Sequence, residues 1–151
     1  MPAAFWPIAF MAIVFTIHGV NMPYMPVWYE KVRHLTGPQI GAMFAAALLA
    51  RVITGPVIAA WVEGQADPRK GYRLLAFGLT GSTLLAAFAP NYATLVVAAF
   101  LIQNCLSSLI PYAEASALIA TRSGSISYGQ ARGMGSSAFV AASLLMGVLM
   151  A

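Results

Sequence analysis

Charged residues are scarce in this sequence, which has 8 lysines and arginines and 4 aspartates and glutamates among 151 residues. The charged fraction is therefore 8%, whereas soluble domains carry roughly 25%. Together with 60% hydrophobic residues and a mean hydropathy of +0.79, this composition predicts an integral membrane protein. The net charge of +4 comes from basic residues that are spread along the chain. They form no patch, so we expect no nucleic-acid partner.

Other absences exclude further kinds of site and classes of protein. The one cysteine, Cys105, lies inside an apolar run, which excludes an internal disulfide and a multi-cysteine metal site. The first apolar run has no basic residues before it and is too long for the core of a cleaved signal peptide. The Gly-x-Ser-x-Gly and His-Glu-x-x-His patterns of hydrolases are also absent. Of the protein classes considered, we therefore expect an intramembrane enzyme least. We also expect no catalytic residues, no cofactor and no metal ion.

Five apolar runs are long enough to be membrane spans, since a helix needs about 20 residues to cross the bilayer. They cover residues 3–29, 38–62, 72–90, 92–120 and 128–151. The connections are short, hold most of the charge, and are rich in glycine, proline, asparagine and serine, as turns are. The sequence therefore predicts an all-α membrane protein with one helix-bundle domain over residues 1–151. The last run ends without a polar tail, so we expect a truncated chain.

The basic residues are divided unequally between the two sides of the predicted bundle. Short cytoplasmic loops are enriched in lysine and arginine, so the richer side predicts a cytoplasmic N-terminus. The richer side carries Arg69, Lys70, Arg73, Arg122 and Arg132, and the other side carries Lys31 and Arg33.

Three charged residues lie one helical turn or more inside the predicted spans: Arg51, Glu114 and Arg132. From a rise of about 1.5 Å per residue, they lie roughly 16, 9 and 6 Å from the cytoplasmic helix ends. Arginine side chains are long enough for all three to meet in one cluster. Charge at such depth usually marks a substrate or ion pathway. The alternatives are a static interhelical bridge, or an Arg132 side chain that extends to the lipid headgroups.

Two stripes of polar side chains predict a wet interior. Gln103 shares a helical face with Glu114 on the fourth run, and His18 shares one with Asn21 on the first run. Such stripes on separate helices are typical of a common cavity. The alternatives are interhelical hydrogen bonds, above all for Asn104, and a packed His18. In the fifth run, the small residues Gly133, Gly135, Ser136 and Ser137 predict a face for close helix packing.

Three segments resemble the N-terminal part of major facilitator superfamily transporters. "GVNMPYMPVW" in the first run and "FAAALLAR", which ends at Arg51, match the pattern of the phenylpropionate permease branch, which is related to the lactose permease and other oligosaccharide:proton symporters. "PYAEA" followed by "YGQARGMGSSAF" is the most specific match. It places Glu114 and Arg132 eighteen residues apart, as in the glutamate–arginine pair with which the lactose permease binds sugar.

The resemblance implies a twelve-helix fold, of which this chain holds an incomplete N-terminal six-helix bundle and lacks its C-terminal partner half. One departure concerns the gating loop between the second and third helices, "AAWVEGQADPRKGYR", where Glu63 stands in place of the usual aspartate. The loop keeps its basic end, and its candidate gating residues are Glu63, Asp67, Arg69 and Lys70.

The resemblance further implies a secondary transporter, a permease of the bacterial inner membrane that couples protons to a small solute. Two arginines against one glutamate leave an excess positive charge, which favours a small or aromatic carboxylate as the substrate. A sugar or nucleoside:proton symporter is the alternative. A structural membrane protein or a non-functional fragment is the alternative of another class. The candidate substrate-binding residues are Glu114, Arg132, Arg51, His18, Asn21 and Gln103.

Overall fold

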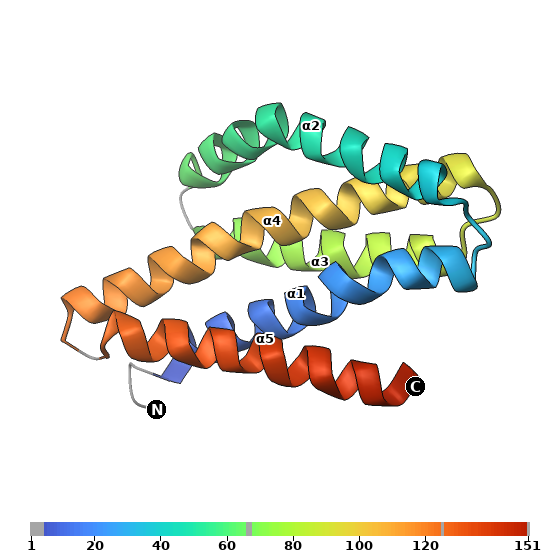
Figure 1. The fold of residues 1–151 in the computed structure, drawn as a ribbon. Helices are drawn as coiled ribbons and strands as arrows, with labels where there is room; N and C mark the ends of the chain where they lie inside the picture. The colour runs from blue at the N-terminus through green and yellow to red at the C-terminus, as the bar shows by residue number, and fades with distance from the viewer. Residues whose placement is uncertain (1–4, 66–67, 125, 151) are drawn as a thin grey trace. The chain divides into compact units, whose positions relative to one another are not determined.

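The computed structural model describes residues 5–65, 68–124 and 126–150, and it confirms an all-helical fold. No strand occurs in these ranges. Figure 1 shows the helices in chain order. They are α1 (Phe5–Lys31), α2 (Gly37–Glu63), α3 (Pro68–Ala87), α4 (Tyr92–Arg122) and α5 (Tyr128–Met150).

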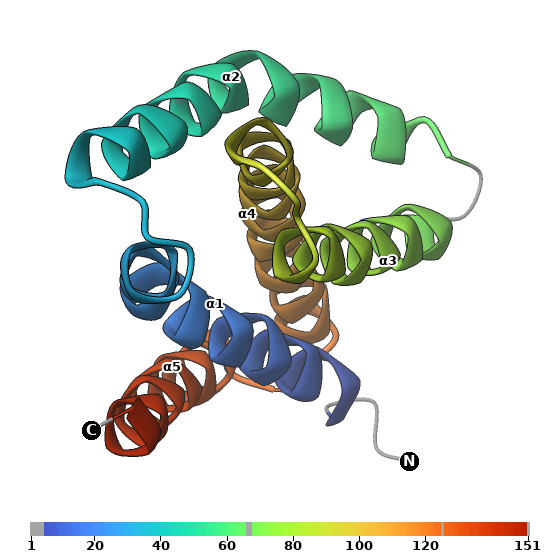
Figure 2. The same cartoon turned by 90° about the vertical axis from the view of Figure 1, so that its right-hand side faces the viewer.

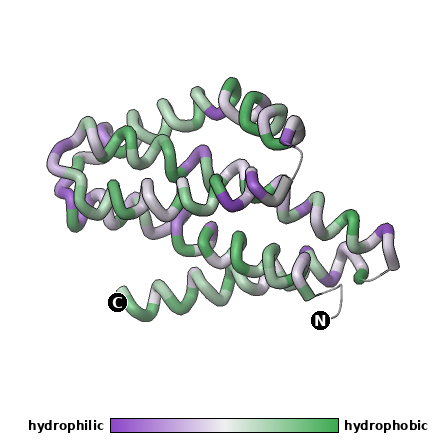
Figure 3. The backbone as a smooth tube through the Cα atoms, turned by 180° about the vertical axis from the view of Figure 1, so that it is seen from behind, coloured by the Kyte–Doolittle hydropathy of each residue, from purple (hydrophilic) through white to green (hydrophobic). Residues whose placement is uncertain are grey.

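Local capping sets where two of the helices begin. At α2 the N–H of Thr36 donates to Oε1 of Gln39 at 2.9 Å, and at α5 the N–H of Ser127 donates to Oε1 of Gln130 at 3.2 Å. In each case the side-chain oxygen of a glutamine three residues later accepts from a backbone N–H that the start of a helix leaves without an intrahelical partner. Hydrophilic residues gather at the helix ends and connections (Figure 3).

Within the described residues, four helices are long and apolar enough to cross a membrane: α1, α2, α4 and α5. The helix α3 forms at the third predicted span, but it begins at Pro68 rather than at Tyr72. Proline fits the first turn of a helix, where its missing N–H is not needed. The early start brings the basic Lys70 into the helix in addition to Arg73, and both residues lower its hydropathy, so that α3 as a span stays a prediction.

The chain divides into two compact units, each of which is described separately. One unit contains residues 1–34 and 110–151, and the other contains residues 35–109. The division falls within α4, next to the proline at position 111.

In the first unit, α1 and α5 lie side by side, as both ribbon views show (Figures 1 and 2). Glycines permit this close approach. A Cβ atom on Gly19 would lie 2.5 Å from the carbonyl oxygen of Phe139, and one on Gly135 would lie 2.9 Å from Cγ of Met11. Small residues at helix contacts are the usual means of tight packing in membranes.

A hydrogen-bonded cluster joins α1 to α5 at a proline. Pro23 has no N–H, so the carbonyl of Gly19, four residues earlier, loses its helical donor. The hydroxyl of Ser143 donates to that carbonyl at 2.7 Å, and the hydroxyl of Tyr24 donates to the carbonyl of Ser143 at 2.6 Å. A Cβ atom on Gly147 would lie 2.7 Å from the Tyr24 hydroxyl. The neighbouring helix therefore replaces the hydrogen bond that the proline removes.

The four residues of the predicted small-residue face of the fifth span lie on two faces of α5 rather than on one. Gly135 is buried against α1, but Gly133, Ser136 and Ser137 are exposed. The two serines follow Gly133 by three and four residues, so these three share a face of the helix that does not include Gly135. The buried positions of α5 follow the helical repeat instead and include Ala131 and Ala142.

In the second unit, a polar contact joins α2 to the first part of α4. The hydroxyl of Thr54 donates to Oδ1 of Asn104, whose Nδ2 donates to the carbonyl of Phe100 at 2.8 Å. Asn104 is 5% exposed. An interhelical hydrogen bond, one of the alternatives for this residue, is therefore what the structure contains. On α3, a Cβ atom on Gly78 would lie 3.1 Å from Sγ of Cys105.

Candidate functional site

An ion pair between α4 and α5 lies at the centre of the candidate site. Nη1 of Arg132 donates to Oε1 of Glu114. The side chains are 43% and 36% exposed, respectively, so the pair is accessible rather than enclosed. Both residues belong to the first unit.

The helix bounds explain why these two side chains meet. Glu114 is eight residues before the end of α4 at Arg122, and Arg132 is four residues after the start of α5 at Tyr128. At about 1.5 Å per residue these offsets are roughly 12 and 6 Å from the α4–α5 connection, a difference that an arginine side chain spans. Alanines at positions 113, 117 and 131 are fully buried around the pair, and such small side chains permit close helix approach.

The ion pair leaves most of its hydrogen-bonding capacity unused. A guanidinium has five N–H donors and an ionised carboxylate has about four acceptor positions, whereas among the described residues the contact between Arg132 and Glu114 uses one of each. The pair can therefore offer donors to a carboxylate or hydroxyl oxygen and acceptors to a hydroxyl hydrogen. Its own charges cancel.

Phe15 of α1, which the sequence did not single out, contacts the same arginine. The guanidinium carbon of Arg132 lies over the Phe15 ring, 4.9 Å from its centroid. This distance is within the range of a cation–π interaction. No periodicity in the sequence distinguishes this phenylalanine from its neighbours in α1, because the contact depends on how α1 packs against α5.

Two further predicted site residues belong to α1 in the same unit. The centroid of the His18 ring lies 6.0 Å from the centroid of the Phe139 ring on α5, and the two rings are tilted relative to each other. His18 therefore faces α5, and both it and Asn21 are half-buried. Their role in lining a solute cavity stays a prediction.

Two of the predicted site residues, Arg51 of α2 and Gln103 of α4, belong to the second unit. Arg51 is exposed and Gln103 is half-buried. The predicted cluster of Arg51 with Glu114 and Arg132 joins residues of different units, and it stays a prediction.

Three of the four candidate gating residues have side chains that lie outside the described residues. Asp67 falls outside them, as do the side chains of Glu63 and Arg69. Lys70 is exposed in the first turn of α3. The gating role of these four residues stays a prediction.

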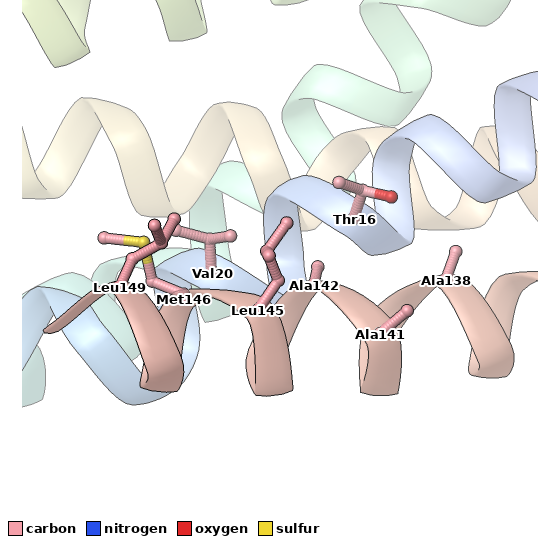
Figure 4. Close-up of a pocket in the computed structure, with 8 residues that line it drawn as sticks. All are labelled: Thr16, Val20, Ala138, Ala141, Ala142, Leu145, Met146 and Leu149. Atoms are coloured by element: carbon pink, nitrogen blue, oxygen red, sulfur yellow. The ribbon is translucent and has the colours of Figure 1, made fainter. Parts of the chain in front are cut away.

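A shallow groove of about 330 Å³ between α1 and α5 offers a different environment (Figure 4). The figure shows Thr16 and Val20 of α1 opposite a row of α5 side chains that includes Leu145 and Leu149. Its lining contains no charged residue, so it lacks the groups that bind a polar solute. Among the described residues, no three histidine, cysteine, aspartate or glutamate side chains gather as a metal site.

Comparison with known proteins identifies the family. A family model described as the MFS_1 like family matches residues 8–151, nearly the whole chain. The chain therefore belongs to the MFS_1 like family and is a multi-pass membrane transporter of the major facilitator type. No curated protein and no solved structure matches it.

Proposed function

We propose that this member of the MFS_1 like family is a proton-coupled symporter that takes up a small organic anion, an aromatic or other small carboxylate, by alternating access. The single observation that carries this proposal is the accessible Arg132–Glu114 ion pair within two helices that are apolar enough to span a membrane. Charge within a membrane span is costly and usually serves a solute or ion pathway. We propose the bacterial inner membrane as its location, with the N-terminus in the cytoplasm.

The choice of an anion depends on Arg51. The ion pair is neutral, so an excess positive charge is present only if Arg51 shares the cavity. In that case the remaining donors of Arg132 and the guanidinium of Arg51 bind the carboxylate, since planar guanidinium groups match its geometry. The similarity of "PYAEA" and "YGQARGMGSSAF" to the phenylpropionate permease branch supports the same choice.

The neutrality of the pair favours a sugar or nucleoside as a second candidate. Without Arg51 in the cavity, the pair offers donors and acceptors in nearly equal measure, which suits the hydroxyl groups of a neutral solute. The related sugar-binding pair of the lactose permease supports this candidate. The two candidates differ in their dependence on Arg51.

Uptake by the protein expressed from its full gene tests the proposal. We expect a pH gradient, alkaline inside, to drive uptake of an aromatic carboxylate more than uptake of a galactoside or nucleoside. Glu114→Gln should lower uptake at least about tenfold, since it removes the negative charge that partners Arg132 and binds the solute, and a loss of about 1.4 kcal/mol of binding free energy is a factor of ten. Glu30→Gln, at an exposed glutamate near the end of α1, is the matched control. Uptake is normalised to the amount of protein in the membrane.

Arg51→Ala separates the two candidates. It should weaken uptake of the carboxylate much more than uptake of a neutral solute, whereas Arg122→Ala, at an exposed arginine at the end of α4, should affect neither. Equal losses for both solutes would argue that Arg51 has a structural role and does not select the anion. Unchanged uptake in Glu114→Gln would remove the ion pair from the solute pathway and contradict the proposal.

A further inference from the structure

The ring of Phe15 makes a cation–π contact with the arginine of the candidate site. The guanidinium carbon of Arg132 lies 4.9 Å from the ring centroid, while Nη1 of the same guanidinium donates to Glu114. Two groups from two different helices, α1 and α4, therefore hold one side chain of α5. An arginine side chain otherwise has several rotatable bonds, and fixing them costs conformational entropy.

Burial of the ring decides between two roles for it. Phe15 is 9% exposed, so it cannot stack broadly on an aromatic solute. Its accessible neighbour is Arg132, whose side chain is 43% exposed. The ring therefore acts on a solute through the arginine rather than by direct contact.

A glycine on α5 lies beside this ring. Gly135 follows Arg132 by three residues and lies on the same helical face. A Cβ atom there would lie 2.9 Å from Cγ of Met11, which would have to shift, and 3.4 Å from Cδ2 and Cγ of Phe15, which is ordinary van der Waals contact. The glycine therefore leaves room for Met11 beside the ring, on the face of α5 that carries Arg132.

We propose that Phe15 is a positioning residue that orients the Arg132 guanidinium toward both Glu114 and the transported solute. The proposal rests on the proposed function, in which the ion pair binds that solute. A ring that fixes the arginine before binding removes an ordering cost at the moment of binding, and preorganisation of this kind improves affinity. The ring thereby sets the apparent affinity for the solute and not the rate of the transport cycle.

Uptake kinetics of Phe15→Leu test this role in the protein expressed from its full gene. Leucine keeps the apolar character but removes the ring face, so we expect KM to rise roughly threefold to thirtyfold, the range of a cation–π interaction. The maximal rate per membrane-inserted protein should remain. Phe15→Tyr keeps the ring and should restore KM to near its original value. Phe139→Leu, the same change elsewhere on the α1–α5 contact, is the matched control.

A second readout does not depend on transport. In protein labelled with ¹⁵N-arginine, the ring current of Phe15 should shift the side-chain resonances of Arg132. Phe15→Leu should remove this shift and Phe15→Tyr should keep it. An unchanged Arg132 resonance in Phe15→Leu would overturn the proposal, whether or not the solute class is correct.

The outcomes separate this inference from the proposed function. If Glu114→Gln abolishes uptake but Phe15→Leu changes neither KM nor the Arg132 resonance, the positioning role is wrong and the proposed function stands. If Glu114→Gln leaves uptake intact, the proposed function is wrong, and the Arg132 resonance alone decides whether the ring orients the arginine. A fall in maximal rate with unchanged KM, or an equal KM change in Phe139→Leu, would show a general packing role instead.

Discussion

Ser143→Ala is expected to destabilise the α1–α5 pair because it leaves a carbonyl without a donor. The Ser143 hydroxyl donates to the carbonyl of Gly19 at 2.7 Å, which Pro23 has deprived of its helical bond. Interhelical hydrogen bonds in membranes average about 0.6 kcal/mol and reach about 1.7 kcal/mol. An acceptor with no alternative partner should fall near the upper value, so we expect the free energy of unfolding to drop by about 1.5 kcal/mol.

A double-mutant cycle with Pro23→Ala tests the physical reason. Alanine at position 23 supplies the missing N–H to the carbonyl of Gly19, so Ser143→Ala should cost only about 0.5 kcal/mol in that background, a coupling of about 1 kcal/mol. Unfolding in mixed detergent micelles, followed by tryptophan fluorescence, measures both steps. Ser137→Ala, at an exposed serine of the same helix, is the control. An equal cost of Ser143→Ala in both backgrounds would refute the role of the proline.

Two further substitutions test the packing of each unit by the same unfolding measurement. Gly19→Ala should lower the free energy of unfolding by about 1–3 kcal/mol, because its Cβ atom would lie 2.5 Å from the carbonyl oxygen of Phe139. Gly133→Ala, which has open space around it, should be neutral or slightly stabilising, and equal effects of the two would contradict the close approach. Asn104→Leu should cost about 0.6–1.7 kcal/mol in the second unit, since it removes the interhelical bond of the Thr54 hydroxyl, which keeps the carbonyl of Ala50 at 3.1 Å as its acceptor. An additive loss with Thr54→Val would show that the two side chains do not act as a pair.

Hydropathy and turn composition predicted the helical class and the approximate helix positions, because a bilayer demands long apolar runs. The pairing of Glu114 with Arg132 also followed from the sequence, since two costly charges near one short connection have few other partners. Both signals are local: each depends on residues that lie within one helix or one hairpin.

Contacts between distant segments could not be predicted in the same way. Pro23 indicates that the carbonyl of Gly19 needs a new donor, but several serines and threonines could supply it, and the choice of Ser143 depends on the register of α1 against α5. The same register brings the Phe15 ring into contact with the Arg132 guanidinium. It also explains why only Gly135 of the predicted small-residue face packs against α1, because the buried side of a helix is set by its partner as well as by its small residues.

The Glu114–Arg132 ion pair also bears on how the chain is integrated into the lipid during its synthesis. A lone arginine opposes partition from the translocon by about 3 kcal/mol at the centre of a span and by less near its end, where Arg132 lies. The helices α4 and α5 are joined by a short connection between Arg122 and Tyr128, so they can leave the translocon as one hairpin with these opposite charges already matched. The two residues that we propose to bind the solute would therefore also favour joint entry of their helices, so that biogenesis and transport would constrain the same positions.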